Sequence, residues 1–168
     1  HGYTITLSDV RLATDQDKAR VEGEKLLEDG MQFLAEQSAQ SARLQAVDKF
    51  QQSLNFFRAA KDQDKEAQAF YCISYTYTLL AEFPKAEAAA EQGMPLAKAA
   101  GNQHTEAYLL DQLGSSFYYR GERTKALEFY LRALSLRSQA APVGLANTLN
   151  NIAMVYAWTG EPRKASSS

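Results

Sequence analysis

Gly121-Glu122-Arg123-Thr124-Lys125-Ala126 is one of three short segments of this chain that are nearly identical. The other two read Ala-Glu-Phe-Pro-Lys-Ala at 81–86 and Gly-Glu-Pro-Arg-Lys-Ala at 160–165. Their closing alanines, Ala86, Ala126 and Ala165, follow one another at intervals of 40 and 39 residues, and one more step back reaches Ala46. A fixed period of this size is typical of proteins built from stacked structural repeats. The sequence therefore predicts four copies of one unit that fill most of the chain.

The composition is that of an ordinary soluble domain, with 168 residues, 45% hydrophobic, 23% charged and a formal net charge of −2. Acidic and basic residues alternate without long runs, so we expect neither nucleic acid nor a membrane as the partner, because both favour a concentrated basic patch. No stretch approaches the roughly 18 apolar residues of a membrane span, and the start of the chain lacks a secretory signal, although a signal could precede His1. The single cysteine, Cys72, cannot form an internal disulfide.

Residues 2–10, within an extended N-terminal segment at 1–14, give the one strand signal in the chain. Tyr3, Ile5 and Leu7 alternate with Thr4 and Thr6, as on the two faces of a strand. A lone strand cannot satisfy its own backbone groups. We therefore expect this extended segment to belong to an upstream β-domain, to pair with another copy of the chain, or to remain frayed.

From about Asp15 onward, apolar residues recur at the three- and four-residue intervals of a helix. Pro84 suits the first turn of a helix, where the amide that it lacks would be unpaired anyway. Gly93 and Pro95 predict a kink or an early stop in that same helix. We expect helices over 17–37, 41–60, 66–80, from Pro84 up to Gly101, and over 104–119, 122–137 and 145–158.

The third copy shows what each repeated residue does. Gly114 lets the two helices of a pair approach closely, Gly121 supplies the turn between them, and Ala126 and Ala133 permit close packing. Larger side chains, Phe117 and Tyr130, fill the space between the helices. This pattern resembles the tetratricopeptide repeat (TPR). The resemblance extends to the other copies through Ala46, Phe50 and Ser53, then Ile73, Ser74, Tyr77, Ala81, Ala86, Ala90 and Gly93, and finally Ile152, Ala153, Tyr156, Gly160 and Ala165.

The resemblance implies an all-α fold, a right-handed superhelix of about three and a half helical hairpins. The expected repeats are 15–61, 62–101, 102–141 and an incomplete 142–168, which leads us to expect that the natural protein continues. The period is longer than the usual 34 residues. It is similar to that of kinesin light chains and of bacterial proteins in which TPR arrays precede a CHAT peptidase domain.

In TPR arrays the first helix of each pair lines a concave groove. Counted from Gly114, the resemblance implies ligand-facing positions at Gln68, Tyr71, Tyr75 and Thr78, at Tyr108, Asp111, Ser115, Tyr118 and Tyr119, and at Asn147, Asn150, Asn151, Met154 and Trp158.

Such a groove is aromatic and rich in amides, which suits recognition of a peptide main chain. It is neutral apart from Asp111, which disfavours the TPR subtype that grips acidic chaperone tails through basic residues. The alternative interpretation is that the tyrosines only pack between helices and that the asparagines are solvated or cap helices. The residues by themselves leave both interpretations open.

Catalysis finds little support in the sequence. His1 and His104 are far apart and Cys72 has no histidine partner at a suitable spacing, so we expect no enzymatic activity, metal site or cofactor. The sequence favours a scaffold that binds a protein or peptide in its groove. The alternatives are a regulatory spacer arm that acts on a downstream effector, such as a CHAT peptidase domain, and self-association through the ends of the chain.

Overall fold

The computed structural model describes residues 12–36, 39–140 and 144–159, so the strand expected at 2–10 lies outside it. The described residues form α-helices and contain no strand. The helices are α1 (Asp15–Glu36), α2 (Gln40–Ala60), α3 (Gln63–Leu79), α4 (Phe83–Ala99), α5 (Gln103–Tyr119), α6 (Arg123–Ala140) and α7 (Leu145–Thr159).

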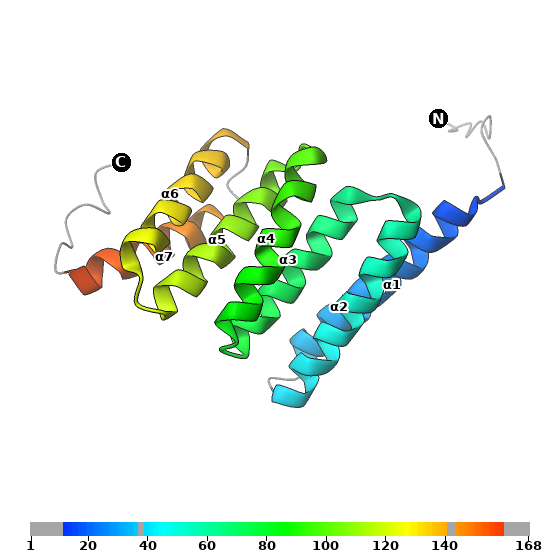
Figure 1. The fold of residues 1–168 in the computed structure, drawn as a ribbon, viewed down its shortest axis with the longest axis horizontal. Coiled ribbons are helices and arrows are strands. Elements are labelled where there is room, and N and C mark those ends of the chain that lie inside the picture. The colour runs from blue at the N-terminus through cyan, green and yellow to red at the C-terminus, as the bar shows by residue number, and fades with distance from the viewer. Residues whose placement is uncertain (1–11, 37–38, 141–143, 160–168) are drawn as a thin grey trace, which may run out of the picture.

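Consecutive helices pack as antiparallel pairs, α1 with α2, α3 with α4 and α5 with α6, and α7 packs against α6 (Figure 1). The odd-numbered helices form a continuous layer, because α3 contacts both α1 and α5, and α5 contacts α7. In the described part of the chain, no Cα atoms of α2 and α4, or of α4 and α6, come within 8 Å of each other. Because the odd-numbered helices contact one another whereas the even-numbered helices, over these described residues, do not, the array curves with the odd-numbered layer on its inner, concave side. The fold is an α-α solenoid.

The alanines that recur with the predicted repeat period are buried to the same extent. Ala46, Ala86 and Ala126 lie on α2, α4 and α6, and none of them has measurable solvent exposure. An alanine at this position lets the outer helix approach the inner one closely. The period seen in the sequence therefore reflects one packing contact made three times.

Glycines on the inner helices allow aromatic rings of the outer helices to lie against the backbone. A Cβ added to Gly114 would come within 2.6 Å of the Tyr130 ring, and one added to Gly30 would meet the Phe50 ring in the same way. Gly30 is the counterpart of Gly114, although the spacing of the repeats in the sequence did not predict it. It lies 16 residues before Ala46, whereas Gly114 lies 12 before Ala126. The difference is one helical turn, because α1 and α2 have 22 and 21 residues whereas α3, α4 and α5 have 17.

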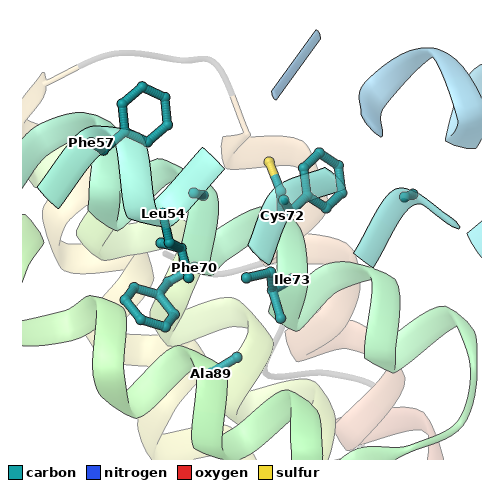
Figure 2. Packing of buried hydrophobic residues seen from close by; sticks show 9 residues of the cluster. Leu54, Phe57, Phe70, Cys72, Ile73 and Ala89 are labelled. Carbon is teal, nitrogen blue, oxygen red and sulfur yellow. The ribbon is translucent and has the colours of Figure 1, made fainter. Parts of the chain in front are cut away.

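The first core cluster joins α2, α3 and α4. Figure 2 shows Leu54 of α2, Phe70 and Ile73 of α3, and Ala89 of α4 gathered between these helices. Each of these side chains is at most 6% exposed. The core therefore runs between successive pairs and joins them into one array.

The early stop expected in α4 was wrong. The helix continues through Gly93 and Pro95 to Ala99. Gly93 is buried, and a Cβ added there would lie 2.8 Å from the Cβ of Phe70, so this glycine serves close packing rather than termination. Pro95 is on the exposed side of α4, where the loss of one amide hydrogen bond to the Glu91 carbonyl is tolerated.

We predict that Gly30→Ala destabilises the protein, although Gly→Ala in a helix is ordinarily favourable by about 1 kcal/mol. The added methyl group must displace the buried Phe50 ring, and overpacking of this kind costs about 1–3 kcal/mol. Urea unfolding measures the change, and Gly30→Ala in a Phe50→Leu background is the matched control, in which the penalty should shrink. A rise in stability on Gly30→Ala alone would contradict this contact.

Candidate functional site: the concave face of α3, α5 and α7

A hollow with a volume of about 260 Å³ opens on the concave side between α3, α5 and α7. Nine of the fourteen residues expected to face a ligand line it, together with Leu79 and Gln112. The nine are Tyr71, Tyr75, Thr78, Tyr108, Asp111, Ser115, Tyr119, Asn147 and Asn151. The structure thus brings side chains from three successive repeats to one place, and contact of these residues with a ligand stays a prediction.

The remaining candidates lie outside this lining. Gln68 donates from its amide to Asp64 at 2.9 Å, next to the start of α5. Tyr118 packs against the core cluster of α5, α6 and α7. Asn150 is exposed, and Trp158 is 69% exposed with the guanidinium of Arg123 5.0 Å from its ring centre. Met154 is half-buried on α7.

Tyrosines form one wall of the hollow. The ring centres of Tyr71 and Tyr108 are 4.9 Å apart, and Tyr75 lies 6.2 Å from Tyr71. Tyr71 and Tyr108 are half-buried, so they also pack between α3 and α5, whereas Tyr75 is 40% exposed. Burial raises the pKa of the Tyr71 hydroxyl well above its ordinary value, so the group remains a protonated hydrogen-bond donor. Interhelical packing and an accessible aromatic surface therefore occur together in this wall.

The floor of the hollow is formed at Asp111, which belongs to a buried charge network. Arg137 of α6 donates from Nη2 to Asp111 of α5 at 2.8 Å and from Nε to the hydroxyl of Thr148 of α7 at 3.0 Å. The Thr148 hydroxyl donates to Asp111 at 2.9 Å. The side chains of Arg137 and Asp111 are only 2% and 6% exposed. Burial raises the pKa of the Asp111 carboxyl, and the hydrogen bond and charge of Arg137 oppose that rise.

Asp111, the one charged residue among the predicted positions, lines the hollow, and its contact with a ligand stays a prediction. Its charge is paired with that of Arg137, so the pair adds no net charge to the hollow. The sequence alone does not indicate the role of Arg137, because it lies in the last turn of an outer helix, where a basic residue is ordinarily solvated. A usable signal was Gly144, whose φ is 83° and whose added Cβ would collide with the Arg137 guanidinium. The conformation and the space at this turn both require glycine.

No protein-family model matches this chain, and no curated protein does. Solved structures do match. BtubC (BKLC) from P. vanneervenii superposes with a TM-score of 0.70 and 17% sequence identity, over 95% of this chain and 63% of BtubC. The C-terminal TPR-containing domain of the putative FK506-binding protein PFL2275c from Plasmodium falciparum superposes with a TM-score of 0.60 and 19% identity, over 90% of this chain and 97% of that domain.

The fold is a tetratricopeptide-repeat fold. The TPR arrangement accounts for the paired helices, the repeated alanines and the concave layer formed by α3, α5 and α7. This chain spans 63% of the length of BtubC, and the likeness to both structures concerns the fold.

The groups that line the hollow are suited to binding. They are phenol and alcohol hydroxyls, carboxamides and aromatic faces, which form hydrogen bonds and apolar contacts. Across the described ranges, no cluster of three or more His, Cys, Asp or Glu residues is arranged to hold a metal ion. Among the helices that the structure describes, none combines the length and the apolar character needed to cross a lipid bilayer.

Cys72 lies beside the tyrosine wall and should react slowly with thiol reagents. It is 7% exposed, its sulfur is 3.9 Å from that of Met31, and burial raises its pKa to about 12. At pH 8 the thiolate fraction would then be about 10⁻⁴, against about one quarter for an ordinary cysteine. We predict modification about 1000-fold slower in the native protein than in urea, with a rate that rises about tenfold per pH unit below pH 9, because only the thiolate reacts. Similar rates in the two states would contradict this environment.

Proposed function

We propose that this chain is a non-enzymatic protein-interaction module whose concave hollow binds an extended, uncharged segment of a protein partner. The observation that carries the proposal is that α3, α5 and α7 present tyrosines and carboxamides to a single hollow. A generic interaction role is consistent with the TPR fold. Nucleic acid and lipid surfaces are poor candidates, because the lining has no basic patch.

The chemistry of the lining supports recognition of a peptide main chain. Asn147 and Asn151 are four residues apart on α7, so they lie on the same face of that helix, one turn apart. Carboxamides both donate and accept hydrogen bonds, as the N–H and C=O groups of an extended peptide require. On the other side, the rings of Tyr71, Tyr75 and Tyr108 offer apolar faces to side chains of the ligand. The pairing of Asp111 with Arg137 removes the electrostatic reason for a strongly charged ligand.

We predict that Tyr75→Ala and Asn151→Ala each weaken the binding of a display-selected peptide by about tenfold or more. The first removes an aromatic contact and the second a hydrogen bond from the binding site. Calorimetry or fluorescence polarisation measures the loss. The matched control is Phe56→Ala on α2, which removes an aromatic side chain of similar exposure, 37% against 40% for Tyr75, outside the hollow. Its affinity should stay within about twofold of the wild type.

Equal losses in the control and the hollow variants would contradict the proposed site. Failure to select any peptide, together with tight association between this chain and another domain of its full-length protein, would favour the regulatory spacer arm instead. A CHAT peptidase domain would be one such effector. A mass that rises with concentration in light scattering would point to self-association.

A further inference from the structure

Arg137 of α6 contacts both α5 and α7, the two helices that meet at the floor of the hollow. One edge of its guanidinium reaches Asp111 of α5 and Thr148 of α7 through different nitrogens, Nη2 and Nε. Its flat face lies over the ring of Tyr108, with 4.2 Å between the guanidinium carbon and the ring centre. A single side chain from the outer layer thus connects the tyrosine wall on α5 with the first turns of α7.

The charge network is one attachment of α7 to the array, and an apolar cluster is another. In the described part of the chain, α7 contacts only α5 and α6. Ile152 and Val155 of α7 join the core cluster that also contains Tyr130, and Tyr156 packs against it. Nearer the start of α7, the hydroxyl of Thr148 attaches the helix to the charge network. Thr148 lies between Asn147 and Asn151 in sequence, so the network sets where these two amides are presented.

We infer that Arg137 is the positioning residue of the concave site: it holds the α7 carboxamides against the tyrosine wall and cancels the charge of Asp111 beneath them. This inference rests on the proposed function for its consequence in binding, whereas the docking of α7 is independent of any ligand.

The arrangement requires a guanidinium. Two N–H groups in one plane bond two acceptors on different helices, while the planar face covers an aromatic ring. A lysine ammonium at this position keeps the charge but cannot reproduce this fork and the stacking contact together. The conservative Arg137→Lys substitution therefore separates the geometry of the group from its charge.

The first test measures α7 docking without a ligand, by amide hydrogen exchange of α7 with α3 as the internal reference. In both Arg137→Ala and Arg137→Lys, the amide hydrogens of α7 should exchange at least about tenfold faster than in the wild type. Loss of the Arg137 contacts lowers the free energy of local opening of α7. Amides of α3 should be unchanged. Ethylguanidinium at millimolar, non-denaturing concentration should restore α7 protection in Arg137→Ala, and ethylammonium should not.

Should Arg137→Ala fail to fold, Thr148→Val serves as the second variant. It leaves the bond between Arg137 and Asp111 in place and removes the link to α7, so faster exchange should again be confined to α7 and its contacts. Unchanged exchange in α7, or equal rescue by ethylammonium and ethylguanidinium, would overturn the inference.

The second test uses a display-selected peptide. Arg137→Lys should weaken its binding by about tenfold, and Asn151→Ala added to Arg137→Lys should cost little more, since an α7 that is no longer positioned already loses that contact. Full additivity of the two substitutions would overturn the positioning role. If no peptide is selected, the proposed function fails while the exchange experiment still decides how α7 is docked.

Discussion

The close approach of the two helices within each pair is the constraint on which the rest of this structure depends. In the first and third pairs, the inner helix places glycine where an aromatic ring of the outer helix lies against its backbone, at Gly30 with Phe50 and at Gly114 with Tyr130. Both rings are fully buried, at 0% and 1% exposure, and burial of a ring of this size contributes about 1.5–3 kcal/mol. The inner helices of neighbouring pairs also contact one another, because α3 touches both α1 and α5, and these contacts form the concave face.

Buried charge is the second constraint. Burial costs a carboxylate or a guanidinium roughly several kcal/mol of hydration free energy. Only well-placed charged or hydrogen-bonding partners offset that loss. Asp111 and Arg137 supply one another with a partner, and Thr148 completes the set. The consequence is functional as well as structural, because the hollow above them presents hydroxyls, carboxamides and aromatic faces with no net charge. Recognition there would depend on hydrogen bonding and shape, which suits a main chain better than a charged tail.

Local patterns in the sequence were enough to predict the helices and their pairing. The repeated alanines and the three- and four-residue spacing located all seven helices to within about three residues at each end, because these signals come from packing contacts that recur at fixed intervals. The exception in α4 has a local cause: Gly93 and Pro95 read as helix breakers, but one packs against Phe70 and the other is on the solvent side. Gly30 was missed because the first pair is one turn longer than the others.

The site was predictable only in part. Counting along the inner helices located the lining of the hollow, since one helix face is set by periodicity alone. Arg137 could not be found in this way, because it reaches Asp111 across 26 residues of sequence and from the outer layer. Such contacts depend on how three helices meet, and the single sequence contains only an indirect trace of them in Gly144.

We propose that the inner layer of the array recognises a partner. The most direct measurement is the change in backbone amide NMR shifts when a display-selected peptide is added to the whole chain. We expect the largest changes on α3, α5 and α7 around Tyr75, Ser115 and Asn151, and little change on α2 and α4. Changes confined to α2, α4 and α6, with the tyrosine wall unaffected, would contradict it.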